Sequence, residues 1–293
     1  MSAAAETLAS NTARRRVKDI VFRSGLLSCV AVGVIALVVL LVYVASKGAP
    51  RLNIDLLTRF PSSLPKRAGA RSAIWGTVWI VGLTAAMCLP VGVAAAVYLE
   101  EFADNRRWWN RLIEVNIQNL AAVPSIVYGI LGLGFIVRGP LGLGPTVLAA
   151  ALTLSLLVLP IVIIASREAL RAVPTSFREG ALALGATPLQ AVRTQVLPAA
   201  VPGIATGAIL ALSRAIGEAA PLLLVGGITF ITFTPTGLDS QFTALPIQIF
   251  NWISRPQEEF KILAAAAIVV LLVILLLMNS VAIWLRNRFE KRW

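Results

Sequence analysis

Two charged residues, Arg214 and Glu218, lie four positions apart inside a mostly apolar segment. On a helix this spacing places both side chains on one face, about 6 Å apart along the axis. A charge in the hydrocarbon core of a membrane costs at least ~2.5–3.5 kcal/mol, so such a residue faces a partner, a cavity or a pathway. Either the cation attracts an anion to a pathway and the carboxylate neutralises it between transport events, or the two form an ion pair that only fixes helix packing.

A long polar interruption, residues 167–199, separates two strongly apolar segments. Its pattern predicts two short helices joined by a turn at Gly185, with Thr187 as the N-cap of the second helix and Pro188 as its first residue. One surface of this hairpin is small and apolar, and it comprises Ala181, Leu182, Ala183, Leu184 and Ala186. Such a surface suits close docking in the groove of a partner. The pattern alone is equally consistent with an ordinary loop or a helix on the membrane surface.

The apolar segments that position these residues are long enough to cross a membrane. The 293-residue chain is 58% hydrophobic and 14% charged, with a mean hydropathy of +0.83, whereas a soluble domain is about 25% charged. Several apolar runs exceed the roughly 18 residues that mark a membrane-spanning helix. We therefore predict an all-α polytopic membrane protein whose six transmembrane helices cover residues 26–45, 73–99, 120–137, 146–165, 202–228 and 262–285.

The basic residues predict the orientation of these six helices. Six crossings place both termini on the same side of the membrane, and that side carries the larger number of lysines and arginines. Because cytoplasmic segments are enriched in basic residues, we expect the N- and C-termini in the cytoplasm. The first outer loop is also basic between Arg51 and Arg71. That loop suits docking of an acidic protein surface, steering of anions or contact with lipid headgroups.

Composition and missing motifs exclude several functions. The net charge of +12, with a sequence pI ≈ 11.0, is explained by basic residues that flank membrane helices and meet anionic lipid, so nucleic-acid binding is not expected. The absence of histidine excludes imidazole metal ligands and imidazole catalysis. No lysine follows a glycine, so the chain has no P-loop of its own. A stand-alone, ion-coupled carrier with Glu218 as a proton relay is an alternative, but it leaves the polar hairpin unexplained.

The hairpin resembles the EAA loop of ABC importer permeases. The pattern of that loop is E-A-A, three residues, G, nine residues, I, one residue and L-P, and its counterparts here are Glu179, Gly180, Ala181, Gly185, Gln195, Leu197 and Pro198. Two positions depart from the pattern, since Gly180 replaces the first alanine and Gln195 replaces the isoleucine. The acidic residue, the glycine and the Leu-Pro pair are retained, so the resemblance implies a helical element that inserts into a cleft on an ATPase subunit.

Further stretches resemble one branch of this family, the permease subunits of phosphate importers. Residues 212–223 (LSRAIGEAAPLL) and 123–133 (VPSIVYGILGL) are similar to phosphate-importer permeases in general. Residues 242–252 (FTALPIQIFNW) are similar to the PstA type of subunit, as distinct from its partner PstC. The resemblance covers nearly all of residues 73–285. A permease for another oxyanion, such as sulfate or molybdate, is the alternative within the same family.

This resemblance implies a complete importer around the chain. A PstC-like permease would form a heterodimer with it in the bacterial inner membrane, and a PstS-like binding protein would deliver phosphate outside. A PstB-like ATPase dimer would bind ATP and Mg²⁺ on the inner face, so the chain itself would be a transport subunit without a cofactor. By position in the motifs, Arg214 and Glu218 would be the pathway charges. The residues that couple to the ATPase would be Glu179, Gly180, Ala181, Leu184, Gly185 and Ala186.

The type I ABC importer permease fold implied by the resemblance divides the chain into four parts. Residues 1–25 form a cytoplasmic N-terminal segment, and residues 26–72 contain the first transmembrane helix and the outer loop. Residues 73–285 form the transmembrane domain of the permease, which includes the coupling loop 167–199, and residues 286–293 form a cytoplasmic tail.

Overall fold

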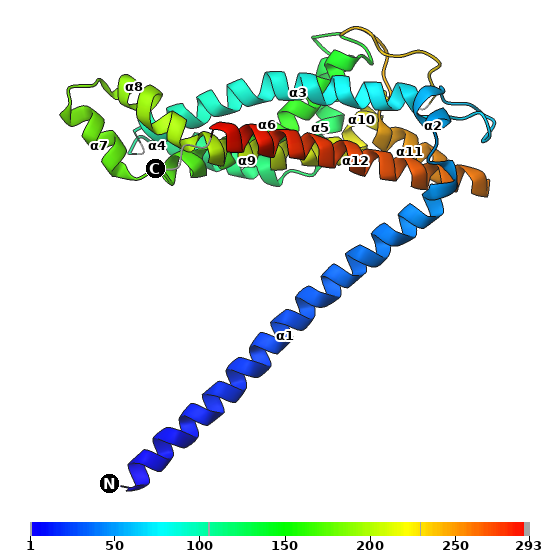
Figure 1. Cartoon of the computed structure of the whole chain (residues 1–293). Helices are drawn as coiled ribbons and strands as arrows, with labels where there is room; N and C mark the ends of the chain where they lie inside the picture. Colours follow the sequence, from blue (N-terminus) through cyan, green and yellow to red (C-terminus); the bar gives the residue numbers. More distant parts are fainter. Residues whose placement is uncertain (1, 105, 229, 290–293) are drawn as a thin grey trace.

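The computed structural model describes residues 2–104, 106–228 and 230–289 of the chain (Figure 1). Its α-helices are α1 (Ser2–Gly48), α2 (Ile54–Thr58), α3 (Arg71–Val97), α4 (Trp108–Ala122), α5 (Ser125–Leu131), α6 (Val147–Arg171), α7 (Thr175–Ala183), α8 (Pro188–Ala191), α9 (Leu197–Gly217), α10 (Ala220–Leu224), α11 (Leu245–Ile253) and α12 (Glu258–Phe289). Shorter helical turns are η1 (Ala49–Arg51), η2 (Tyr98–Phe102), η3 (Gly132–Val137) and η4 (Val192–Val196). The predicted all-α class is confirmed, since the described residues contain no strand and one isolated bridge, between Thr146 and Gln241.

Five helical stretches are long and apolar enough to cross a membrane: Lys18–Arg51, Arg71–Phe102, Val147–Arg171, Pro188–Gly217 and Glu258–Arg288. Among the described residues, a bent pair of helices, Trp108–Ala122 and Ser125–Val137, is either a broken sixth span or a re-entrant loop, and its axes differ by 103°. The predicted number of six is therefore reached only when this pair counts as one crossing.

The predicted third span, residues 120–137, is wrong as a single helix. Val123 and Pro124 are extended, with ψ angles of 132° and 137°, and they separate α4 from α5. Proline lacks a backbone N–H, and it disfavours the helical conformation in the residue before it. The chain therefore breaks at Pro124 although the hydropathy continues without a break.

The predicted fifth span, residues 202–228, is displaced toward the N-terminus. Helix α9 follows α8 and η4 without interruption and ends at Gly217. Glu218 leaves the helix with ψ 112°, and the short helix α10 follows. Pro221 accounts for this end, because a proline at that position cannot donate to the Gly217 carbonyl and its ring clashes with that carbonyl in a continued helix.

Small residues let α9 pack closely on α6. A Cβ built on Gly207 would lie 2.4 Å from the Cβ of Ala165, and one on Gly203 would lie 2.7 Å from the Cβ of Ala169. Small-residue contacts of this kind let membrane helices approach and gain dispersion energy. On its other side α9 meets α12, where the Ser213 hydroxyl donates to Asn279 at 2.8 Å.

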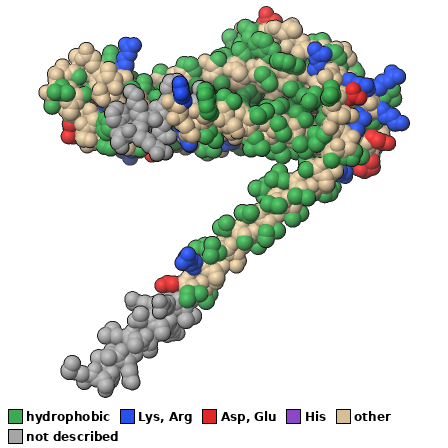
Figure 2. Space-filling view, viewed as in Figure 1, with side chains coloured by type: hydrophobic (Ala, Val, Ile, Leu, Met, Phe, Trp, Pro, Cys, Tyr) green, Lys and Arg blue, Asp and Glu red, His purple; other side chains and the backbone are tan. Residues whose placement is uncertain are grey.

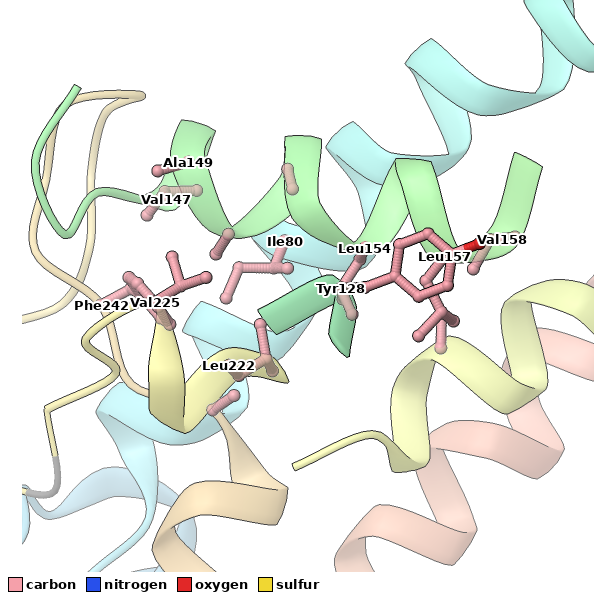
Figure 3. Close-up of a cluster of buried hydrophobic side chains, with 14 of the residues drawn as sticks. Ile80, Tyr128, Val147, Ala149, Leu154, Leu157, Val158, Leu222, Val225 and Phe242 are labelled. Carbon is pink, nitrogen blue, oxygen red and sulfur yellow. The ribbon is translucent and has the colours of Figure 1, made fainter. Parts of the chain in front are cut away.

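A buried apolar cluster joins α3, α5, α6 and α10 to the segment before α11. Figure 3 shows Ile80, Tyr128, Leu154, Leu222 and Phe242 converging in it, each 5% exposed or less. The cluster holds the short helices α5 and α10 against the long ones, and it thereby fixes the positions of both helix breaks.

Helix α1 leaves the bundle and projects away from it (Figure 1). It touches α12 near its C-terminal end, where a Cβ on Gly48 would lie 2.7 Å from the backbone nitrogen of Ala266. Its most apolar stretch is entirely unburied within the chain, and Figure 2 shows hydrophobic side chains around it. A helix that is apolar all round is covered by lipid or by another polypeptide.

Candidate functional site

The predicted helix–turn–helix hairpin is present at one end of the bundle (Figure 1). Helices α7 and α8 are separated by a turn in which Gly185 has φ +85°. Thr187 caps α8 in a capping box with Gln190, and Pro188 is the first residue of α8. The local signals of the sequence therefore form the expected structure, because caps and a glycine with positive φ depend on neighbouring residues alone.

The tip of this hairpin is uncovered within the chain. Glu179, Gly180 and Gly185 are exposed, Ala181 and Ala186 are half-buried, and Leu184 is 91% exposed. Leu182 and Leu189 are exposed as well. A projecting apolar tip of this kind marks a surface that another protein covers.

The base of the hairpin is bound by charges that sequence reasoning missed. Glu100 and Glu101 end the helical stretch that contains α3, and their partners are arginines of α6 and α7: Arg167, Arg171 and Arg178. The arginine partners lie 67 to 77 positions away in the sequence. One signal for these contacts was present in the sequence, because two adjacent glutamates directly follow the predicted membrane helix 73–99. The prediction placed these glutamates outside the helix and gave them no partners.

Arg214 and Glu218 form the predicted pair, but not on one helical face. Arg214 lies in the last turn of α9, and Glu218 is the residue at which that helix ends. Arg214 Nε donates to Glu218 Oε1 at 3.3 Å, and the two side chains are 48% and 18% exposed. A cation in the last helical turn also interacts favourably with the helix dipole. The two residues therefore form an ion pair, and about half of the Arg214 side chain remains exposed.

The pair lies where the two broken helices meet. Helices α5 and α10 are in contact, and a Cβ on Gly129 would lie 2.7 Å from the Cα of Pro221. The Tyr128 hydroxyl donates to the Leu120 carbonyl at 2.8 Å across the break at Pro124, and Glu218 lies two positions before the first residue of α10. Discontinuous helices deep in a membrane form substrate sites in many transporters, because irregular backbone is tolerated where it lines a cavity.

Arg214 lies within the length of the bundle. It is ~25 Å along α9 from Leu197 at 1.5 Å per residue. Helix α9 ends part-way along α3 and α12. Helices α10 and α11 lie nearer the end of the bundle opposite the hairpin (Figure 1). The position of Arg214 inside the hydrocarbon region stays a prediction.

The uncovered side of Arg214 belongs to an open face of α9. Beyond the first turn of this helix, where Pro198 is exposed, the exposed residues are Gly203, Leu210, Arg214 and Gly217. They recur after seven, four and three positions, so they lie along one stripe of the helix. This stripe is uncovered within the chain, and it is a surface that lipid or a second polypeptide can cover.

A multi-pass helical protein with broken helices around a membrane-embedded ion pair, and with a projecting apolar hairpin, is a transport permease by fold. Residues 88–293 match the family described as "Binding-protein-dependent transport system inner membrane component", and the chain belongs to this family.

Curated relatives and a solved structure agree with this assignment. The chain is 33% identical to the probable ABC transporter permease protein YqgI of Bacillus subtilis over 234 residues, which are 80% of this chain and 78% of YqgI. It is 34% identical to the phosphate transport system permease protein PstA 2 of Mycobacterium tuberculosis over 260 residues, which are 86% and 82% of the two chains. A chain of the MetNI methionine ABC transporter in an inward-facing conformation has the same fold, with a TM-score of 0.63 and 19% identity over 75% of this chain and 95% of that one. The expected type I importer permease fold is thereby confirmed.

Proposed function

We propose that the chain is the permease subunit of an ATP-driven importer that moves inorganic phosphate into the cytoplasm. The observation that carries this proposal is the half-uncovered Arg214 guanidinium at the meeting point of two broken membrane helices. Relatives named as phosphate permeases support the choice of anion.

The ion pair gives phosphate a site that can also release it. A guanidinium offers parallel N–H donors that match two phosphate oxygens. Glu218 neutralises Arg214 when no anion is bound, at little cost because the two groups are already in contact at 3.3 Å. When phosphate occupies the site, the same carboxylate repels it, so the anion is held weakly enough to move on.

The open surfaces support three kinds of partner. A second permease, of the PstC type, supplies the other wall of the pathway beside α9. A PstB-type ATPase dimer, which binds ATP and Mg²⁺, receives the exposed tip at Leu184 in a cleft. A PstS-type binding protein delivers phosphate at the opposite end of the bundle.

The orientation follows from the hairpin. Helix α12 ends toward the hairpin end of the bundle, and the N-terminus of α1 also lies in that direction (Figure 1). If the hairpin meets a cytoplasmic ATPase, both termini of this bacterial inner-membrane protein are cytoplasmic. The basic residues Arg286 and Arg288 near the end of α12 agree with this orientation.

The test is uptake of radiolabelled anions by proteoliposomes that contain the chain with its permease and ATPase partners. We expect ATP-dependent uptake of phosphate and little uptake of sulfate or molybdate. Preferred uptake of either other oxyanion would leave the permease assignment intact and overturn the choice of phosphate.

Proteoliposomes with the chain alone provide the control for the mechanism. We expect no uptake when a pH gradient is applied without the ATPase. Gradient-driven uptake by the chain alone would contradict the proposal and favour a stand-alone carrier that uses Glu218 as a proton relay.

A further inference from the structure

The hairpin is bound to the membrane helices through the side chain of Arg178, in α7. Its Nε donates to the two carboxylate oxygens of Glu101 at 3.2 and 3.0 Å, and its Nη2 also donates to Glu101. The side chains are 23% and 7% exposed. A paired arrangement of this kind fixes the angle between the two groups as well as their distance.

The same guanidinium caps the end of α6. Its Nη1 donates to the carbonyl of Val173 and its Nη2 to the carbonyl of Leu170, both at 3.0 Å. The last carbonyls of a helix lack intrahelical donors and favour a nearby cation. The hydrogen bonds that Arg178 donates to Glu101 raise the pKa of Arg178 above its ordinary value, so the guanidinium stays charged at this junction. One side chain therefore joins α7, the end of α6 and the turn η2 that follows α3.

The neighbouring carboxylate, Glu100, makes a separate set of contacts. It accepts from Arg167 at 3.3 Å and from two nitrogens of Arg171 at 3.0 Å each. Both arginines belong to α6, so these contacts join α3 to α6 without reaching the hairpin. Two adjacent glutamates thus serve two different junctions.

The rest of α7 is held less firmly. No residue of this helix is fully buried, and Phe177 packs against the apolar cluster at the end of α6. A force on the exposed tip at Leu184 reaches α9 along the continuous helix that begins with α8, and it reaches α3 and the end of α6 through the directional contacts of Arg178. Helix α6 in turn packs against α9 at Gly207 and Ala165, and α9 carries Arg214.

We propose that Arg178, paired with Glu101, is the positioning residue through which movement of the hairpin reaches the membrane helices. This proposal rests on the proposed function, because it assumes that an ATPase moves the hairpin. It adds a named mechanical connection between the docking tip and the pathway.

The experiment measures phosphate imported per ATP hydrolysed, in proteoliposomes that contain the complete importer. The variants are Arg178→Gln, Glu101→Gln and the double variant. We expect each single variant to keep its ATPase partner and its ATP hydrolysis, and to lower the ratio by roughly five-fold or more, the lower end of typical coupling effects between sites. The double variant is expected to fall no further, because both changes break the same connection.

A conservative variant separates geometry from charge. Arg178→Lys keeps the positive charge but loses the paired geometry and part of the capping of α6. We expect a ratio between that of the wild type and that of Arg178→Gln. A wild-type ratio in Arg178→Gln would overturn the proposal.

The matched control is Arg171→Gln, which removes one of the two arginines bound to Glu100 and leaves the hairpin contacts of Arg178 in place. We expect it to lower the melting temperature while the ratio stays at the wild-type value. An equal fall of the ratio in Arg171→Gln would overturn the proposal. Failure of all the Arg178 and Glu101 variants to assemble with the ATPase would also overturn it, because the contacts would then be merely structural. Failure of the wild-type importer to take up phosphate would instead contradict the proposed function.

Discussion

Two ion pairs of this molecule, Arg178–Glu101 and Arg214–Glu218, differ in how completely the chain satisfies them. At the base of the hairpin, Arg178 donates to both oxygens of Glu101 and to two backbone carbonyls, and the carboxylate is 7% exposed. In the membrane, Arg214 makes one contact at 3.3 Å with Glu218 and is 48% exposed. A fully satisfied pair holds elements together, whereas a pair with open donors is available to a ligand. On the proposed function, this difference distinguishes a pair that connects elements of the chain from a pair that is open to the anion.

Removal of one carboxylate from each pair should show this contrast in stability. Glu101→Ala leaves a largely buried cation without its partner, and we expect a loss of about 3–5 kcal/mol in the free energy of unfolding. Glu218→Ala leaves a half-exposed cation, and we expect a loss of about 1 kcal/mol or less. Denaturant unfolding of both variants in detergent measures the two values, and equal losses would break the comparison.

A smaller contrast concerns one glycine from each region. Gly185 has φ +85°, so Gly185→Ala should cost roughly 1–2 kcal/mol from left-handed strain. Gly217, beside the membrane pair, has an ordinary φ and open space around its Cα. The same unfolding measurement should show that Gly217→Ala changes stability by about 0.5 kcal/mol or less. If Gly185→Ala left the free energy of unfolding unchanged, the turn would be able to relax and Gly185 would not define the shape of the hairpin tip.

The smallest expected effect is a gain at Gly180, in the middle of α7. This residue is exposed, and nothing lies within 4 Å of a Cβ built on it. Gly180→Ala restores the alanine of the EAA pattern and should stabilise the chain by about 0.5–1 kcal/mol through helix propensity. Thermal unfolding checks the gain, and phosphate uptake should stay unchanged. A loss of uptake would show that the departure from the pattern is required at the docking surface.

The sequence predicted features that depend on near neighbours. The hairpin turn at Gly185 and the cap at Thr187 follow from local chemistry, and both were confirmed. The pairing of Arg214 with Glu218 was also correct. The predicted helix 202–228 was too long, however, because α9 ends at Gly217 and hydropathy does not show the effect of Pro221. The Arg178–Glu101 contact joins residues 77 positions apart, so no local pattern could have shown it.

The orientation, the boundaries of the four parts and the roles of the site residues remain predictions. The structure adds one detail to the proposed C-terminal tail, since α12 continues to Phe289 and residues 290–293 lie outside the described residues. The proposed N-terminal segment joins the first membrane helix without a break, as α1 runs from Ser2 to Gly48.

The central claim is that Arg214 serves the anion while Arg178 connects the hairpin to the membrane helices, and phosphate uptake by Arg214→Gln in the complete importer tests the first part most directly. Arg138→Gln, which changes an exposed arginine outside the membrane pair, is the control with the same change of charge. We expect Arg214→Gln to retain the melting temperature and the ATPase partner and to lose phosphate uptake by about ten-fold or more, the equivalent of one charge-assisted hydrogen bond. The control should transport normally. Wild-type uptake by Arg214→Gln would contradict the claim and reduce the membrane pair to a packing contact.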